Sequence, residues 1–298
     1  MWSALTNWNR WFGTIYRFHP LFSIVILLSV LAGYFIETAT LFAIVFVHEL
    51  GHVLAAKSFG WRVKEVQLLP FGGVVVVEEQ GSVPAWQEIV VALWGPLQNV
   101  WMIAAAAGLQ WCGLISGDWA AYFIQANVFI ALFNLLPILP LDGGKMMQSC
   151  LSLWLPYHRV IVFSCLISLA FSSVLVAISL LHALRGGIQM NLLIIGLFLL
   201  YSNWYAYKGL SYHFMRFLIN REFVLSRLMN QGTLAQPIVV NGRLKVTDIV
   251  RLFIREKYHL IYVMDERGAI CAVLPEQPLL QSYFNESKRG CAISELFM

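Results

Sequence analysis

Two histidines and a glutamate stand close together in the stretch Phe46–Val53, as a His-Glu-x-x-His pattern inside a run of apolar residues. On a helix, residues four apart lie on the same face, so His48 and His52 can direct two imidazoles at one metal ion while Glu49 lies beside it. This arrangement is typical of zinc peptidases. The alternative is a pair of histidines that make ordinary hydrogen bonds, since the pattern also occurs by chance.

The composition indicates that this pattern belongs to a membrane protein. Hydrophobic residues make up 59% of the 298 residues and charged residues only 12%, and the mean hydropathy is +0.70. Such a chain has too few polar side chains to cover a soluble globule. Ionisable groups inside a membrane span are costly, which favours a functional role for the motif. The modest net charge of +4 says little about nucleic acid, and we expect no such partner.

Six apolar windows are long enough to cross a bilayer, for which roughly 20 residues are needed. They lie at about 20–36, 39–58, 86–114, 120–140, 160–183 and 189–207. Lys and Arg accumulate on the cytoplasmic side of membrane proteins. If Arg10 and Arg17 are cytosolic, alternation leaves Arg185 as the one flanking basic residue on the opposite side. We therefore predict six transmembrane helices with both termini in the cytosol.

A catalytic metal site needs a third ligand, for which Asp142 is the strongest candidate. It lies at the end of the fourth window, where Pro137 and Pro140 stop the helix and two glycines free the chain to turn directly after Asp142. His48 lies ten residues before the cytosolic exit of its own window, hence about 15 Å deep. Both parts of the site would then approach from the cytosolic side. The alternative is an exposed Asp-Gly turn at the membrane surface.

The stretch Val66–Glu78, between the second and third windows, is apolar and β-branched but is broken by proline and glycine. Backbone at membrane depth that is not helical must find hydrogen-bond partners in protein or water. We therefore predict a re-entrant β-hairpin beside a cavity. The alternative is a hairpin on the cytosolic surface of the membrane.

A second interruption, Gly95–Asn99, falls inside the third window. Small and helix-breaking residues in such spans usually serve close helix packing or a kink. We interpret this stretch as structural.

After residue 207 the composition becomes that of a soluble domain. A basic connector at 208–224 is followed by a helical segment, Val246–Lys257, among short β-rich runs. These runs are Ile238–Val240, Ile261–Met264 and Ile270–Leu274. We divide the chain into a membrane domain (1–207), a linker (208–224) and a small α/β domain (225–298). The last is near the lower size limit for an independent core, so docking or pairing is expected.

The two motifs together resemble those of the site-2 protease family of intramembrane metalloproteases. His48-Glu49-x-x-His52 resembles the first family motif, and Asn134-x-x-Pro137-x-x-Pro140-Leu141-Asp142-Gly143 resembles the second. The resemblance implies Zn²⁺ held by His48, His52 and Asp142, with Glu49 as the general base. It also implies that the second motif and the hairpin loop bind substrate, through Asn134, Pro140, Phe71, Gly72 and Gly73.

The C-terminal domain resembles a cystathionine-β-synthase (CBS) domain at Thr247–Phe253 and Tyr262–Gly268. The implied fold is an α-helical polytopic membrane protein, with six transmembrane helices and a re-entrant β-hairpin, followed by a small α/β CBS domain. This likeness implies ATP as a ligand and homo-oligomers through CBS pairing. Many nucleotide-binding relatives carry Thr/Ser-x-x-Asp where this chain has Pro275-Glu276-Gln277-Pro278, so the nucleotide contacts are left open.

The resemblance is to the branch that acts in bacterial sporulation. It implies cleavage of a membrane-associated protein near the cytosolic face, the pro-segment of a sporulation sigma factor (pro-sigma-K), in the membrane around the forespore. Membrane inhibitory or regulatory proteins are implied as partners. The competing class is non-enzymatic: a CBS-regulated membrane transporter or a metal-binding scaffold. Glu49 is unnecessary for simple metal transport and the windows show no evident internal repeat, so we expect a zinc metalloendopeptidase.

Overall fold

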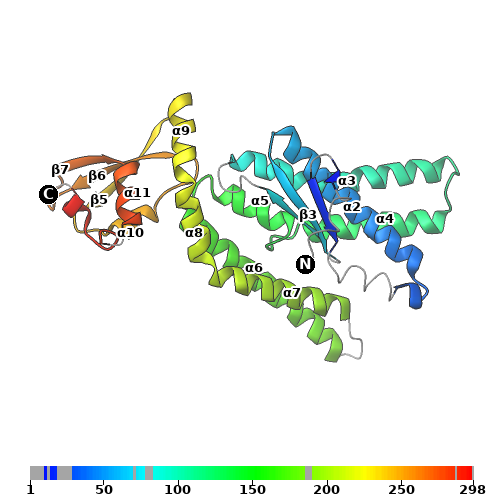
Figure 1. Ribbon diagram of the computed structural model, residues 1–298. Coiled ribbons are helices and arrows are strands. Elements are labelled where there is room, and N and C mark those ends of the chain that lie inside the picture. The colour runs from blue at the N-terminus through cyan, green and yellow to red at the C-terminus, as the bar shows by residue number, and fades with distance from the viewer. Residues whose placement is uncertain are drawn as a thin grey trace, which may run out of the picture.

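The computed structural model describes residues 10–11, 14–18, 29–69, 72–77, 83–184, 190–285 and 287–296. A helical part with a four-stranded sheet is followed by a C-terminal α/β part at the opposite end of the molecule (Figure 1). The helices of the first part are α2 (Phe35–Ser58), α3 (Ala85–Trp111), α4 (Gly117–Asn134), α5 (Asp142–Leu151), α6 (Tyr157–Leu184) and α7 (Met190–Lys208).

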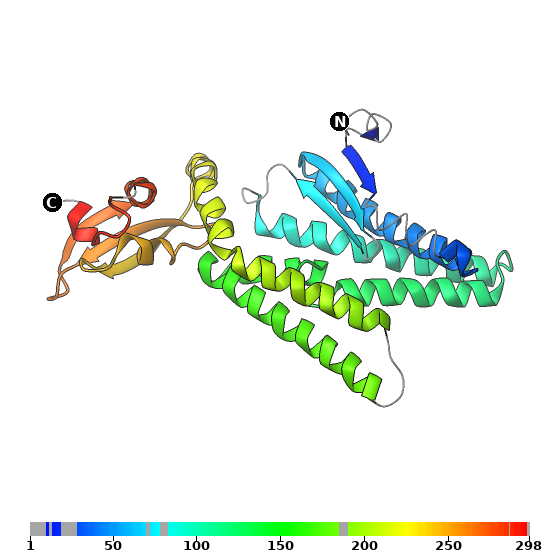
Figure 2. The same ribbon diagram turned by 60° about the horizontal axis from the view of Figure 1, so that its bottom comes forward.

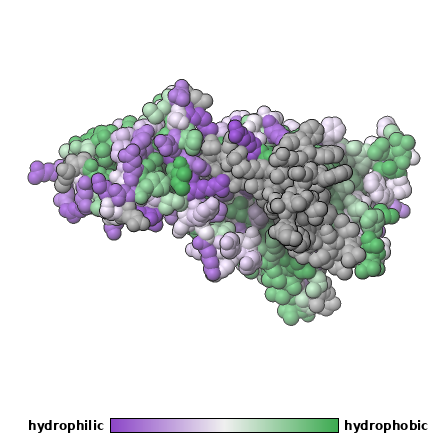
Figure 3. All heavy atoms as spheres, viewed as in Figure 1, coloured by the Kyte–Doolittle hydropathy of each residue, from purple (hydrophilic) through white to green (hydrophobic). Residues whose placement is uncertain are grey.

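Within the described ranges, three helices are long and apolar enough to cross a membrane: α2, α3 and α6. They coincide with the predicted windows 39–58, 86–114 and 160–183. Large apolar side chains such as Trp101, Trp111 and Leu184 are exposed on them. Figure 3 shows hydrophobic residues gathered over the far ends of α6 and α7, and many hydrophilic residues over the C-terminal part. An apolar surface of this kind is stable against lipid rather than water.

The complete set of six spans stays a prediction. Helices α4 and α7, of 18 and 19 residues, occupy the windows 120–140 and 189–207. The window 20–36 lies mostly outside the described residues.

A four-stranded sheet lies beside α2, as Figure 2 shows. Its order is β1 (Arg10–Trp11), β2 (Thr14–Phe18), β3 (Val63–Leu69) and β4 (Gly72–Val77). Strands β3 and β4 are antiparallel and form the predicted hairpin. Strand β2 pairs in parallel with β3, which the sequence did not indicate, and β4 lies at the edge of the sheet. Whether the hairpin re-enters the membrane stays a prediction.

The C-terminal part is a small α/β unit, as predicted. Its three-stranded sheet has the order β5 (Ala235–Asn241), β6 (Tyr258–Met264) and β7 (Ile270–Pro275), with β5 parallel and β7 antiparallel to β6. Its helices are α10 (Val246–Val250) and α11 (Glu276–Phe284). The predicted helix 246–257 thus ends at Val250. Helix α11 was missed because two prolines flank its start, yet proline is tolerated in a first turn, where the backbone N–H has no partner.

The range 208–224, expected to be a linker, is largely helical: it holds α8 (Leu210–Ile219) and the start of α9 (Arg221–Gln231). Phe214, Phe217 and Leu218 are buried in one apolar cluster with Ile161 of α6 and the interior of the C-terminal part. Helix α8 therefore joins the membrane helices and the α/β unit through a shared core.

Three polar side chains are fully buried in the C-terminal part. Arg221 donates to both oxygens of Glu276, at 2.8 Å each, and to the carbonyl oxygens of Ile254 and Arg255. His259 Nδ1 donates to Glu276 at 2.5 Å, and its Nε2 accepts from the Ile254 N–H, so the ring is neutral. Burial lowers the pKa of His259. Burial acts to raise the pKa of Glu276, but the hydrogen bonds from Arg221 and His259 outweigh it and hold the pKa below its usual value.

Candidate metal centre

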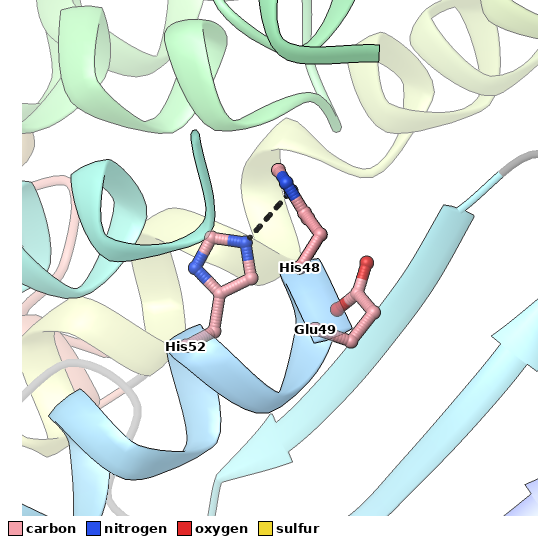
Figure 4. A group of neighbouring side chains, drawn as sticks. All are labelled: His48, Glu49 and His52. Atoms are coloured by element: carbon pink, nitrogen blue, oxygen red, sulfur yellow. Dashed lines mark hydrogen bonds between the residues drawn. The ribbon is translucent and has the colours of Figure 1, made fainter. Parts of the chain in front are cut away.

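Three metal-binding atoms converge between α2 and α5. Helix α2 places His48 and His52 one turn apart, with Glu49 beside them (Figure 4). The two Nε2 atoms are 3.2 Å apart. Asp142 Oδ2 lies 3.1 Å from His48 Nε2 and 3.0 Å from His52 Nε2. All four side chains are buried, so the structure brings the predicted ligands and the predicted base together.

The segment between α4 and α5 holds Asp142 in place. Helix α4 ends at Asn134 and α5 begins at Asp142, where the positive end of the helix dipole favours a carboxylate. The Leu139 N–H donates to Ser168 Oγ at 2.9 Å, and Asn203 Nδ2 donates to the Leu139 carbonyl oxygen at 2.6 Å. Side chains from α6 and α7 therefore fix the approach to the ligand.

The expectation that the chain turns directly after Asp142 is wrong, because Gly143 and Gly144 belong to α5. A Cβ atom on Gly143 would lie 2.1 Å from the Leu135 carbonyl oxygen, and one on Gly144 2.5 Å from the Ile138 carbonyl. The two glycines let α5 pack directly against the backbone of the preceding segment.

The outer nitrogen of each imidazole faces an oxygen acceptor. His48 Nδ1 lies 2.6 Å from Asn99 Oδ1, and His52 Nδ1 lies 2.7 Å from the Val91 carbonyl oxygen. Asn99 is oriented by its own Nδ2, which donates to Asn127 Oδ1 at 3.1 Å. Each Nδ1 therefore carries a proton, and in the neutral ring Nε2 keeps a lone pair for a metal ion.

This donor set fits a zinc ion. When both rings are neutral, two Nε2 lone pairs and a carboxylate oxygen lie 3.0–3.2 Å apart, and a cation among them removes their mutual repulsion. Tetrahedral zinc with bonds of about 2.0–2.2 Å separates its ligand atoms by about 3.3–3.5 Å, close to this spacing. Three protein ligands would leave a fourth position open, as in catalytic sites.

The residues on α3 that orient the rings were missed by the sequence analysis. A Cβ atom on Gly95 would lie 2.3 Å from His52 Nε2 and 2.7 Å from His48 Nε2, so the glycine gives room to both rings. Close packing at Gly95 agrees with the structural interpretation of this stretch. Asn99 could have indicated that this helix contacts the metal centre, because an amide side chain in an apolar span is costly unless it has a hydrogen-bond partner.

A cavity of about 310 Å³ leads from the metal centre to the C-terminal part. Its wall includes Glu49, His52, Glu88, Asp142, Lys145 and Arg255. It contains acidic and basic groups as well as apolar ones, so it can hold water beside the ligands.

Two of the predicted substrate-binding residues, Asn134 and Pro140, lie away from this cavity. Asn134 Nδ2 donates to the Ile130 carbonyl oxygen of its own helix, and Pro140 is exposed. In the part of the chain that the structure describes, neither lines this cavity. Gly72 and Gly73 begin β4, and Phe71 falls outside the described residues.

Comparisons with known proteins agree with this geometry. The model of peptidase family M50 matches residues 36–117 and 113–176. The chain is 32% identical, over 97% of its length and 99% of the relative, to stage IV sporulation protein FB from Bacillus subtilis. It is 31% identical, over 44% of its length and 40% of the relative, to zinc metalloprotease MJ0392 from Methanocaldococcus jannaschii.

A solved structure shares the fold. The site-2 protease from Methanocaldococcus jannaschii superposes with a TM-score of 0.54 and 24% identity, covering 66% of this chain and 93% of that one. The chain belongs to peptidase family M50, the site-2 proteases, and is an intramembrane metalloprotease.

Proposed function

We propose that this chain is a zinc endopeptidase in which His48, His52 and Asp142 hold the metal and Glu49 is the general base. The observation that carries this assignment is the convergence of three metal-binding atoms, Nε2 of His48 and of His52 and one Asp142 oxygen, while the Nδ1 atom of each histidine donates to an oxygen on the far side of its ring. Glu49 is buried beside them and lines the same cavity. A scaffold that only stores metal would need no such carboxylate.

His48, His52 and Asp142 would hold a zinc ion that lowers the pKa of a water molecule towards about 7 and polarises the scissile carbonyl. Glu49 would accept a proton from the attacking water and pass it to the leaving amine. Asn99 and the Val91 carbonyl keep the imidazoles in the tautomer that the site requires. Lys145, whose Nζ lies 3.3 Å from Asp142 Oδ1, keeps that oxygen turned away from the two histidines.

The substrate has to be unwound before its carbonyl can be attacked, because a helix buries its carbonyl groups in hydrogen bonds. Strand β4 supports a route: it is an edge strand in contact with α2, so an extended substrate segment can pair with it. Asn134, Pro140 and the Phe71–Gly73 loop stay proposed substrate contacts. Proline substitutions along Val74–Val77 should impair cleavage of a membrane-tethered substrate. Unchanged cleavage would exclude strand pairing.

The proposed substrate is a membrane-associated pro-segment of a sporulation sigma factor, of the pro-sigma-K kind. Support comes from the sporulation relative, which matches this chain over 97% of its length. Co-expression with a tagged precursor tests the proposal: the tagged segment should shorten with the wild-type chain and stay intact with Glu49→Gln. A precursor that is never shortened would exclude this substrate without contradicting the peptidase activity of the family.

We also propose that the chain lies in the membrane surrounding the forespore, that its six spans leave both termini in the mother-cell cytosol, and that membrane proteins regulate the enzyme. Reporter fusions at each loop test the topology. The α/β unit is proposed to be a CBS-like domain that pairs with a second copy. Its sheet leaves Val239 and Val273 exposed on one face, which supports pairing.

ATP binding at this unit stays a prediction. Glu276, at the position of the nucleotide-contacting motif, is already bound by Arg221 and His259. Equilibrium dialysis with labelled ATP tests the prediction directly.

A chelator experiment separates the protease from the transporter or scaffold. Purified chain in detergent is treated with a chelator, and cleavage of a reporter peptide is followed before and after zinc is added back. Loss of cleavage and its return with zinc support the protease. Binding of zinc by a chain that never cleaves the peptide would favour the non-enzymatic alternative.

A further inference from the structure

The C-terminal part contacts the first turn of α3, the helix that orients both histidines. Arg255 Nη1 and Nη2 donate to the two oxygens of Glu88 at 2.7 and 2.6 Å, and Nη2 also donates to the Val83 carbonyl oxygen at 2.9 Å. Glu256 accepts a hydrogen bond from the Ala85 backbone N–H at the start of α3. Ser149 Oγ of α5 donates to Glu88 at 2.7 Å. We refer to Glu88, Arg255 and Glu256 as the clasp.

The clasp closes a helix end that has no cap of its own. Pro84 precedes α3 and makes no side-chain capping bond. The Glu256 carboxylate takes one of the unpaired N–H groups of the first turn, and its charge suits the positive end of the helix. Arg255 in turn neutralises Glu88 through a two-pronged ion pair, a geometry that fixes orientation as well as charge.

The loop that carries Arg255 and Glu256 is held from inside the C-terminal part. Arg221, which is fully buried, donates to the carbonyl oxygens of Ile254, Arg255 and Lys257. It is anchored in turn on Glu276. The position of Arg255 therefore follows the position of the whole α/β unit.

Helix α3 connects the clasp to the metal centre. Val91, whose carbonyl oxygen holds His52, lies three residues beyond Glu88, less than one helical turn and about 4.5 Å along the axis. Gly95 and Asn99 follow on the face that meets both imidazoles. A shift or fraying of the first turn would move the acceptor of His52 directly.

We propose that Arg255 is a positioning residue for the metal centre, so that docking of the C-terminal part through the clasp sets the zinc affinity of the site. This inference rests on the proposed zinc function. Arg255 also walls the cavity that contains Glu49, although it touches no ligand. The clasp makes the α/β unit a component of the active site rather than an appendage.

The test uses the full-length chain in detergent, with Arg255→Gln, Glu88→Gln and the double variant. Zinc dissociation constants come from competition with a coloured chelator, and cleavage of a reporter peptide is measured at limiting and at excess zinc. Each single variant should weaken zinc binding by about tenfold, the lower end of the range for outer partners of metal ligands. The double variant should be no weaker than the singles, because both remove one interaction. Excess zinc should restore cleavage.

Arg251→Gln is the matched control. Arg251 lies four residues before Arg255 and makes an exposed ion pair with Asp248 at 3.4 Å. It should leave zinc binding unchanged. Arg255→Lys keeps the positive charge but loses the paired hydrogen bonds of the guanidinium group to Glu88. Its zinc dissociation constant should therefore lie between those of wild type and Arg255→Gln. It also provides a folded variant if Arg255→Gln is unstable.

Two results would overturn the proposal. One is a zinc dissociation constant for Arg255→Gln and Glu88→Gln equal to that of wild type. The other is a loss of zinc affinity in the double variant equal to the sum of the losses, in free energy, of the two single variants, which would mean that the residues act separately. A wild-type chain that neither binds zinc nor cleaves the peptide would instead refute the proposed function, so the two failures are distinct.

Discussion

Adding one methyl group at Gly95 is the sharpest perturbation that the structure offers. The new Cβ atom of Gly95→Ala would lie 2.3 Å from His52 Nε2, 2.4 Å from His52 Cε1 and 2.7 Å from His48 Nε2. Non-bonded heavy atoms rest at about 3.5 Å or more. The His52 ring or helix α3 therefore has to move by about 1 Å.

A displacement of this size is incompatible with an intact zinc site. Metal–ligand distances in functional sites hold to within about 0.2 Å. A misplacement of about 1 Å is enough to cost on the order of 100-fold in catalysis. We expect Gly95→Ala to weaken zinc binding by about 100-fold or more and to abolish detectable cleavage.

Gly108→Ala is the control for this prediction. Gly108 lies in the same helix, and a Cβ atom there would have no heavy atom within 4 Å. Alanine is favoured over glycine in a helix by about 1 kcal/mol, so this variant should fold, bind zinc and cleave as wild type does. Zinc affinity by chelator competition, helicity by circular dichroism and reporter-peptide cleavage check both variants. A Gly95→Ala chain with wild-type zinc affinity would refute the close approach of α3 to the two rings.

Four further predictions concern single groups. Glu49→Gln should retain zinc, measured by atomic absorption, and lose about 10²–10⁴-fold in cleavage, because it removes only the base; full activity would exclude that role. Asp142→Asn should lower the zinc content, and unchanged content would move the third-ligand role to another residue. Asn99→Leu should weaken zinc binding by about 10–100-fold, because it leaves His48 Nδ1 without an acceptor, whereas Asn99→Asp should keep it; equal losses would contradict a role in orientation. The C-terminal part should lose stability as the pH falls below about 6.5, because the pKa of His259 is lowered in the folded chain and the unfolded chain therefore binds a proton first. It should lose further stability below about 4.5, because the pKa of Glu276 is also lowered by folding. Calorimetry of the whole chain in detergent between pH 8 and pH 4 checks this, and an unfolding temperature that does not change with pH would contradict it.

The sequence was sufficient to predict the two histidine ligands, because both lie in one helix, four residues apart. His48 and His52 are one helical turn apart, so their meeting is a property of local geometry. Asp142 followed from the need for a third ligand and from the prolines that end α4. The strands of the C-terminal part were also predictable, because their β-branched runs are bounded by turn residues.

Other features depend on contacts between distant segments. The parallel pairing of β2 with β3 joins residues about fifty positions apart, and parallel pairs have no local turn signal. The role of Gly143 is visible only once the backbone of Leu135 lies against it. The ion pair of Glu88 with Arg255 is likewise unpredictable, because nothing in the sequence places the two residues side by side. These are the parts of the site that tertiary packing decides.

The capping of α3 by Glu256 has a consequence for the order in which the enzyme is made. Ala85 leaves the ribosome 171 residues before the carboxylate that completes its helix end. A nascent chain that ends before Glu256 already has both histidines and Asp142, yet the first turn of α3 lacks the carboxylate that caps it. If docking through the clasp sets the zinc affinity, a chain that stalls before Glu256 would lack this cap and would bind zinc more weakly than the finished chain.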